Sequence, residues 1–231
     1  AQARKEYLER LVSGGFGSKT ETIPVFESCG RVTAKAVYAH ICAPHYAASA
    51  MDGVAVSAKE TFGATETTPV TLKPDQFLVL DTGDPIPEDK DAVIMVEDIV
   101  KNGDGSITIH AAAAPWQHIR QIGEDVCAGE MILPSHMTVS PAAIGAMIAG
   151  GVLEIEVIRK PVVGIIPTGD EIIPPCTDPK PGDILEFNGS IFSAMVRSWG
   201  AEAVVYPIVP DKFNQIKEMV AKAADECDMV I

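Results

Sequence analysis

The amino-acid sequence predicts a multi-domain protein in which a β-rich region is followed by an α/β region built on a parallel sheet. Three observations support this fold class. The chain has 231 residues, more than one typical domain of about 150 residues. Short β-rich runs separated by Pro, Gly and Asp clusters fill its middle. After residue 160, strand and helix patterns alternate.

The elements of the first half follow from apolar periodicity and from the residues that interrupt it. Tyr7, Leu8 and Leu11 share one face of a predicted N-terminal helix, which glycines at 14, 15 and 17 end. Short β-rich runs then alternate with turn residues, as in a small β domain. The predicted strands cover residues 22–26, 53–56, 70–72, 77–80, 92–96 and 107–109.

A helix is predicted to begin at Ser140 and Pro141, because Ser is a common N-cap and Pro suits the first helical position. The segments that follow give a βαβαβ pattern, which predicts a parallel sheet. They are strands at 153–158, 162–166 and 203–208, helices at 188–199 and 212–225, and an apolar run at 229–231.

The helix at 188–199 is predicted in most detail. Asn188 is expected to cap its first turn. One apolar face is expected to be formed by Ile191, Phe192, Met195, Val196 and Trp199. Because a strand has only begun where the sequence ends at Ile231, we expect a fragment whose α/β domain is incomplete.

The charge of the chain excludes several classes of partner. It has 18 Lys and Arg against 32 Asp and Glu, a net charge of −14, which argues against nucleic acids and anionic membranes. No apolar stretch approaches the roughly 20 residues of a membrane span, and the charged start does not resemble a secretory signal, so we expect a cytoplasmic protein. The five cysteines lack C-x-x-C spacing and predict buried, reduced thiols.

Four loop motifs place a carboxylate beside a glycine, although each tripeptide taken singly is also usual in turns. They lie at 50–53, 81–85, 123–126 and 168–171. The last is the strongest, because it follows the predicted strand at 162–166, and ligands of open parallel sheets bind beyond the carboxyl ends of strands. The Thr168 hydroxyl, the Gly169 amide and the adjacent carboxylates of Asp170 and Glu171 could together hold a hydrated Mg²⁺ ion.

Taken together and in order, these segments resemble the molybdopterin molybdotransferase family, the MoeA proteins and the gephyrin E domain. The residues that carry the resemblance are Pro44, 49–56, 82–87, 91–97, 119–120, 123–126, Gly129, 159–161, 168–172, 182–183 and Asn188. Three positions depart from the family pattern: Val54 replaces a usual Tyr, Asp84 a small residue, and Pro167 a common Ser.

The resemblance implies a fold with a discontinuous first domain, a β-rich domain inserted into it, and an α/β domain like stand-alone molybdopterin-binding proteins. By this resemblance the first domain covers residues 1–43 and 133–159, the inserted domain 44–132, and the start of the α/β domain 160–231. A fourth, β-rich domain is expected of the family after the end of this sequence.

The resemblance also implies an enzyme of molybdenum cofactor biosynthesis, a transferase that inserts molybdenum from molybdate into adenylylated molybdopterin and releases AMP. We expect the fragment itself to be inactive. The implied catalytic residues are Asp52, Thr82, Asp125 and Glu171, and the implied cofactor-binding residues are Thr168, Gly169, Asp170 and Asn188. The implied metal is magnesium, bound by Asp170 and Glu171.

The family arrangement further implies a homodimer in which Asp52, Thr82 and Asp125 face the α/β domain of a partner subunit. A non-catalytic alternative stays open, because the same fold serves as a scaffold in gephyrin. Such a protein would keep the fold and its molybdopterin affinity without turnover.

Overall fold

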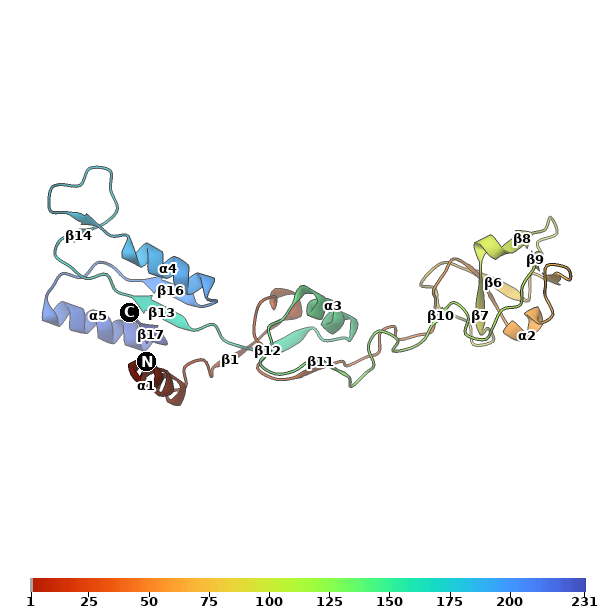
Figure 1. Ribbon diagram of the computed structural model, residues 1–231, viewed down its shortest axis with the longest axis horizontal. Coiled ribbons are helices and arrows are strands. Elements are labelled where there is room, and N and C mark those ends of the chain that lie inside the picture. The colour runs from red at the N-terminus through yellow and green to blue at the C-terminus, as the bar shows by residue number, and fades with distance from the viewer. Residues whose placement is uncertain (1) are drawn as a thin grey trace. The chain divides into compact units, whose positions relative to one another are not determined.

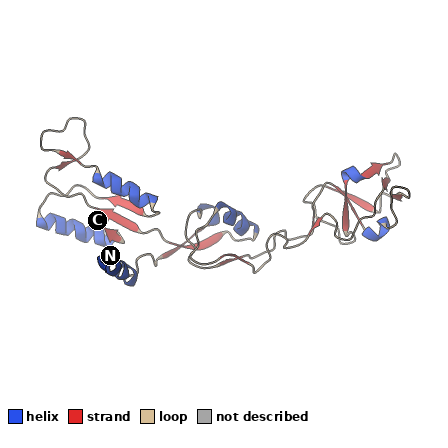
Figure 2. Ribbon diagram, in the orientation of Figure 1, coloured by secondary structure: helices blue, strands red, loops and turns tan. Residues whose placement is uncertain are grey.

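The computed structural model describes residues 2–231, which divide into two compact units. The α/β unit comprises the residues up to 21 together with 156–231, and the β-rich unit comprises 22–155. Figures 1 and 2 show the helices and strands of each unit. The predicted fold class, mixed α/β and β-rich, is confirmed. The division into three domains stays a prediction.

Strand β4 (Gly53–Val56) lies at the centre of the β-rich unit. It pairs antiparallel with β6 (Phe77–Leu80) and β7 (Ala92–Met95). A second antiparallel sheet has the order β5-β9-β8, formed by Val70–Leu72, Ile107–Ile109 and Ile99–Lys101. Apolar side chains of both sheets, among them Val54, Leu72 and Ile109, form one buried core. The strands predicted at 53–56, 70–72, 77–80 and 107–109 are therefore confirmed.

Gly53 allows the close approach of β4 to β7. A Cβ atom on this residue would lie 2.0 Å from the carbonyl oxygen of Ile94, far inside van der Waals contact. The chain bends at residues 50–52, and Gly53 itself is the first residue of the central strand. Val54, which stands where the family usually has Tyr, is only 1% exposed, so a change at this position acts through the core.

Shorter elements complete the β-rich unit. Ser140 caps α3 (Pro141–Ala149) as predicted, with its Oγ accepting a hydrogen bond from the Ala143 amide at 3.2 Å. The predicted strand at 22–26 is shifted, because β1 covers Thr20–Pro24 and a 3-10 helix follows at Val25–Glu27. The remaining elements are β2 (Val37–Tyr38), β3 (Ala48–Ser49), α2 (Ala58–Thr61), a 3-10 helix (Val96–Asp98), β10 (Ile119–Arg120) and β11 (Met131–Leu133). Strand β12 (Glu154–Ile158) begins in this unit and ends in the α/β unit.

The α/β unit contains a parallel sheet of the predicted kind. Its strand order is β16-β13-β17, formed by Glu202–Val205, Val162–Ile165 and Met229–Val230. Helix α4 (Asn188–Ser198) packs against β13 and β16, and α5 (Phe213–Glu226) packs against β13 and β17, on opposite faces of the sheet (Figure 1). Helix α1 (Gln2–Ser13) precedes them, and β14 (Ile172–Ile173) pairs with β15 (Ile184–Leu185).

Gly164 sets how closely α5 approaches the sheet. A Cβ atom here would lie 3.1 Å from both the Cys227 sulfur and the Tyr206 ring, and 3.5 Å from the Ala223 methyl group. Ala223 is fully buried. The alternation of side chains along β13 then turns Val163 toward the other face of the sheet, where α4 packs.

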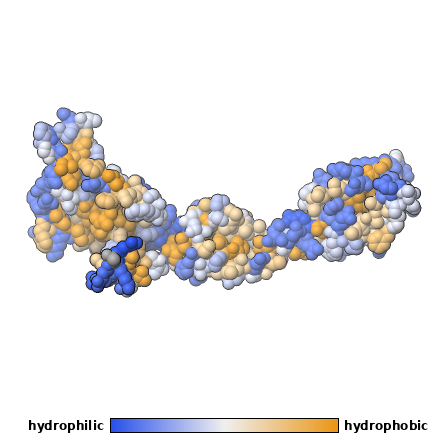
Figure 3. Space-filling view, viewed as in Figure 1, coloured by the Kyte–Doolittle hydropathy of each residue, from blue (hydrophilic) through white to orange (hydrophobic). Residues whose placement is uncertain are grey.

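Helix α4 differs from its prediction in two respects. Its buried face consists of the small or narrow residues Gly189, Ser193 and Val196, because these positions lie against the sheet. Four of the five predicted core residues are exposed: Ile191 49%, Phe192 43%, Met195 38% and Trp199 72%. The space-filling view shows apolar side chains gathered on the surface of this unit (Figure 3).

The predicted cap at Asn188 is wrong, because Phe187 holds the N-cap position and Asn188 is the first helical residue. The Glu186 carboxylate instead accepts the hydrogen bond from the Gly189 amide at 2.6 Å. A carboxylate here satisfies one unpaired N–H group and complements the helix dipole. At the start of α5, Lys212 holds the N-cap position and makes no side-chain capping hydrogen bond.

Asp228 ties together three segments of the α/β unit. Its Oδ1 accepts from Lys19 Nζ at 2.9 Å, its Oδ2 accepts from the Val162 amide at 2.8 Å, and the Arg159 guanidinium also donates to Oδ2. The side chain is only 13% exposed. Burial raises the pKa of Asp228, but the Val162 amide, Lys19 and Arg159 outweigh it and lower the pKa to about 2.

Asp228→Asn should destabilise the α/β unit by about 2 kcal/mol at pH 7, since each unit of pKa shift is worth about 1.4 kcal/mol. Because the folded pKa is below the unfolded one, this stabilisation is present above about pH 4 and is lost as the pH falls toward 2. Urea unfolding followed by Trp199 fluorescence, in a Trp116→Phe background, measures it. Asp225→Asn on exposed α5 is the control, and equal stability of the two variants at pH 7 would contradict the prediction.

Candidate functional site

The loop at 168–171 leaves the central strand β13 and runs beside the segment that leaves its neighbour β16. Thr168 forms a parallel bridge with Val209. The Gly169 amide donates to the Val209 carbonyl at 3.1 Å, and the Val209 amide donates to the Pro167 carbonyl at 2.9 Å. The Asp211 amide donates to Asp170 Oδ1 at 3.2 Å. Two loops are thus held together at the carboxyl edge of the sheet, where ligands of open parallel sheets bind.

Gly169 is required at the centre of this loop. It is buried and has a φ of 149°, a conformation that side chains rarely adopt. A Cβ atom would lie 2.9 Å from the Ile172 side chain and 3.1 Å from Glu171 Oε2. This glycine adjoins a bridge at Thr168 and a bend at Asp170, and both of these flanking residues are exposed.

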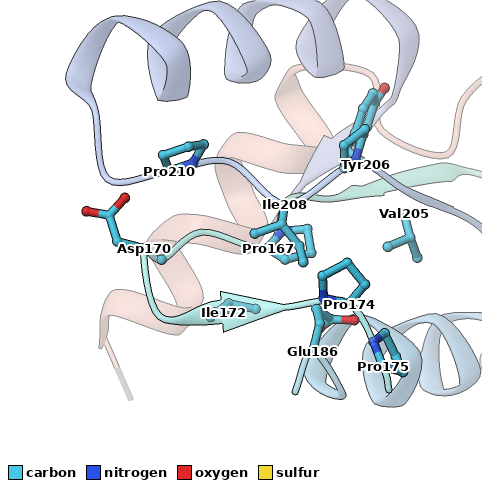
Figure 4. A pocket seen from close by; sticks show the side chains of 12 residues that line it. Pro167, Asp170, Ile172, Pro174, Pro175, Glu186, Val205, Tyr206, Ile208 and Pro210 are labelled. Carbon is cyan, nitrogen blue, oxygen red and sulfur yellow. The ribbon is translucent and has the colours of Figure 1, made fainter. Parts of the chain in front are cut away.

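Two cavities adjoin the loop. The smaller, of about 210 Å³, is lined by Thr168 and Asn188 together with apolar residues such as Phe192. The larger, of about 560 Å³, is lined by Gly169, Asp170 and a group of prolines. Figure 4 shows the larger cavity, with the Asp170 carboxylate pointing away from its apolar lining. The structure therefore brings Thr168 and Asn188 together, although they are distant in sequence.

The side chains of residues 170 and 171 are chemically suitable ligands for magnesium. Asp170 and Glu171 are both exposed and offer only carboxylate oxygens, the ligands that Mg²⁺ prefers. Within residues 2–231, no three His, Cys, Asp or Glu side chains gather into a metal cage. Two carboxylates suit an ion that keeps several waters and shares a substrate's phosphates.

In the β-rich unit the structure brings Asp52 and Thr82 together. The Asp52 Oδ1 accepts two hydrogen bonds from Thr82, one from the hydroxyl at 2.6 Å and one from the amide at 2.7 Å. Both residues are exposed. The Thr82 hydroxyl and then its amide lower the pKa of Asp52, because they stabilise the carboxylate form. Asp84, in the same loop, accepts from the Asp81 amide at 2.9 Å and so stabilises the turn.

Thr82→Val should raise the pKa of Asp52, since the hydroxyl that stabilises its charged form is lost while the amide remains. The carboxylate therefore stays charged to a lower pH in the wild type than in the variant. Carbon-detected NMR titration of the Asp52 carboxyl group measures the difference. Thr71→Val is the matched control, because Thr71 bonds to the Thr108 hydroxyl and to no carboxylate; equal Asp52 titration in both variants would refute the assignment.

Asp125 is paired with Arg120. Arg120 Nη2 donates to Asp125 Oδ1 at 2.5 Å, and its Nε lies 3.5 Å from Glu124 Oε1. The hydrogen bond to Asp125 is the main cause of the raised pKa of Arg120. Sequence reasoning gave no site role to Arg120, although a basic residue five positions before an acidic loop residue was the available signal. The pair partly neutralises a carboxylate that an anionic ligand would otherwise meet.

The sequence-predicted residues therefore form two groups. Asp52, Thr82 and Asp125 belong to the β-rich unit, and Thr168, Gly169, Asp170, Glu171 and Asn188 belong to the α/β unit. Their roles stay predictions.

Comparison with models of protein families shows to which family the chain belongs. Residues 1–151, more than half of it, match the family model described as MoeA N-terminal region (domain I and II). The chain belongs to the MoeA family. Residues 164–231 match a second model, described as a probable molybdopterin binding domain. The resemblance derived from the motifs is confirmed.

Curated MoeA relatives match over almost the whole chain. A molybdopterin molybdenumtransferase 2 of Mycobacterium tuberculosis is 34% identical over 226 residues, covering 91% of this chain and 56% of the relative. A molybdopterin molybdenumtransferase of Haemophilus influenzae is 30% identical over 242 residues, covering 100% of this chain and 59% of the relative. The chain thus spans less than two thirds of the length of these relatives.

Solved structures of MoeA proteins have the same fold. One molybdopterin biosynthesis MoeA protein from Pyrococcus horikoshii matches with a TM-score of 0.80 and 33% identity, covering 92% of this chain and 60% of its own. A second MoeA structure from the same genus matches with a TM-score of 0.82 and 28% identity, covering 98% and 62%. Among the described residues 2–231, no helix is long and apolar enough to cross a membrane.

Proposed function

We propose that the protein is a molybdopterin molybdenumtransferase that inserts molybdenum from molybdate into adenylylated molybdopterin and releases AMP. The observation that carries this proposal is the paired loop at the carboxyl edge of the sheet, where Asp170 accepts from the Asp211 amide, in a chain that matches MoeA family models over 1–151 and 164–231. The relatives named as molybdenumtransferases support the same reaction.

In this proposal Thr168, Gly169 and Asn188 bind the cofactor substrate beside the smaller cavity. Asp170 and Glu171 hold Mg²⁺, which when bound supplies positive charge between these carboxylates and the anionic substrates. Asp170 is itself fixed by the Asp211 amide, so the loop presents its carboxylate without reorganisation.

The residues of the β-rich unit act on the reacting groups. Asp52 accepts from the Thr82 hydroxyl and so fixes the direction in which that hydroxyl presents its lone pairs. Asp125 is oriented by Arg120. We further propose a homodimer in which these residues complete the site of the partner subunit.

The direct test uses the complete gene product with adenylylated molybdopterin, Mg²⁺ and molybdate. AMP release measured by chromatography should depend on molybdate, and molybdenum should appear on the pterin product. Tight binding of adenylylated molybdopterin without molybdate-dependent AMP release would instead favour the non-catalytic, scaffold alternative.

Mixing two inactive variants tests the shared site. Asp52→Ala and Glu171→Ala subunits should regain partial activity after exchange, because one of the two sites in a mixed dimer then has both wild-type residues. Native mass spectrometry confirms that mixed dimers have formed. Mixed dimers with no activity above either parent would count against a site shared between subunits.

A further inference from the structure

The structure corrects the predicted burial of the cysteines. All five are free; Cys29, Cys127 and Cys176 are exposed, and Cys42 and Cys227 are half-buried. Cys42 and Cys127 belong to facing segments of the β-rich unit.

Cys42 and Cys127 are direct neighbours across an antiparallel bridge. Ala43 and Val126 exchange both of their backbone hydrogen bonds, at 2.8 Å and 3.2 Å. The adjoining pair in such a ladder makes no hydrogen bonds, and its Cα atoms approach to about 4.5 Å. Cys42 and Cys127 flank the bridge as this adjoining pair, and the Cα spacing expected of such a pair lies within the range of about 4.4–6.8 Å that a disulfide spans.

The two sulfur atoms also point to the same place. A Cβ atom on Gly123 would lie 2.8 Å from Cys127 Sγ and 3.6 Å from Cys42 Sγ. Because both sulfurs adjoin this one point, they lie no farther apart than those two distances together. Since Gly123 has no side chain, the space beside both sulfur atoms is not filled by a Cβ atom of this residue.

Backbone contacts hold each thiol in this position. The Cys127 thiol donates to the Gly123 carbonyl at 3.4 Å. The Ala128 amide donates to the Cys42 sulfur at 3.3 Å. The backbone around the Ala43–Val126 bridge therefore holds both thiols on the same side, beside Gly123.

We propose that Cys42 and Cys127 form a reversible disulfide when the protein meets a peroxide. The thiolate of the exposed Cys127 attacks one peroxide oxygen and breaks the O–O bond, giving a sulfenic acid and a hydroxide that is protonated to water. The Cys42 thiolate then attacks the sulfenic sulfur, forms the S–S bond and expels a second hydroxide, which becomes water. Two thiols are oxidised and one peroxide is reduced, and a dithiol reductant reverses the reaction.

The local charge favours a neutral oxidant. Glu124, Asp125 and Glu130 lie within three residues of Cys127, and Arg120 is the cation that pairs with the first two of them. The Glu130 carboxylate accepts from the Cys127 amide itself at 3.0 Å. This excess of negative charge repels an anionic disulfide such as oxidised glutathione but not hydrogen peroxide.

The disulfide closes a loop that contains all three predicted catalytic residues of the β-rich unit, namely Asp52, Thr82 and Asp125. Asp125 lies two residues from Cys127, and its amide donates to the Ala43 carbonyl at 2.9 Å. Oxidation therefore fixes covalently the two segments through which the chain enters and leaves this loop.

Hydrogen peroxide treatment of the folded 231-residue chain, followed by alkylation in denaturant and peptide mapping, tests the proposal. We expect two of the five thiols to resist alkylation, one linked peptide pair containing Cys42 and Cys127, and full recovery of five thiols after dithiothreitol. The same treatment in urea should scatter the pairing among all five cysteines, because the bridge is then absent.

Variants separate the pair from general thiol oxidation. Cys29→Ser, which removes another exposed thiol of the same unit, should leave the linked peptide unchanged. Cys42→Ser should abolish it and convert Cys127 to irreversible sulfinic or sulfonic acid. The proposal is overturned if wild-type Cys127 becomes over-oxidised while Cys42 remains alkylatable, if links form only between chains, or if oxidised glutathione reacts faster than peroxide.

Discussion

Asp170→Asn and Glu171→Gln should each reduce molybdate-dependent AMP release on the order of 100-fold. Mutating a residue that merely orients a metal ligand already lowers metal affinity or activity by about 10–100-fold, and these two residues are the proposed ligands themselves. Each substitution removes one negative charge but keeps the shape of the side chain. Both residues are exposed, so we expect thermal unfolding to change little. The complete gene product is assayed for AMP and melted under the same conditions.

Asp178→Asn provides the matched control for these substitutions, because Asp178 is also an exposed carboxylate of the α/β unit and is outside the loop at 168–171. It should retain wild-type turnover. Raising the Mg²⁺ concentration should partly restore Asp170→Asn if the lost function is metal binding. Wild-type turnover in both loop variants would disprove the proposed metal site.

Gly53→Ala should destabilise the β-rich unit by about 3 kcal/mol, the upper part of the range for overpacking. The added Cβ atom would meet the Ile94 carbonyl at 2.0 Å, so β4 and β7 must separate at the centre of their sheet. Urea unfolding followed by Trp116 fluorescence, in a Trp199→Phe background, reports on this unit alone.

Gly103→Ala is the control for this substitution, because a Cβ atom there meets no atom within 4 Å. It should change the free energy of unfolding by less than about 1 kcal/mol. If Gly53→Ala unfolds at the same urea concentration as Gly103→Ala, the close approach of β4 to β7 is not as the structure describes it.

Local sequence patterns predict much of this fold. The strand at 53–56 and the helix begun by Ser140 and Pro141 were predictable, because β-branched runs and an N-cap act over a few residues. The parallel sheet followed from the alternation of strands and helices.

Features that depend on distant partners were not predictable in the same way. The buried face of α4 is chosen by the sheet it covers, so Ser193 is buried and Phe192 is exposed. The cap from Glu186 depends on the path of the preceding segment.

The candidate site shows the same division. Its residues were predictable as motifs, but the bond from Asp211 to Asp170 crosses 41 positions. No local pattern specifies such a pairing. The facing of Cys42 and Cys127 likewise required the bridge at Ala43 and Val126.

The missing side chain at Gly164 also restricts the register of the central strand β13. If β13 slipped by one residue, Val163 or Ile165 would have to occupy the space beside Tyr206 and Cys227, where even a single Cβ atom would be 3.1 Å from each. Such a slip also reverses which face every side chain of the strand meets. Gly164 therefore restricts the register in which β13 pairs with β16, where it lies opposite Val204.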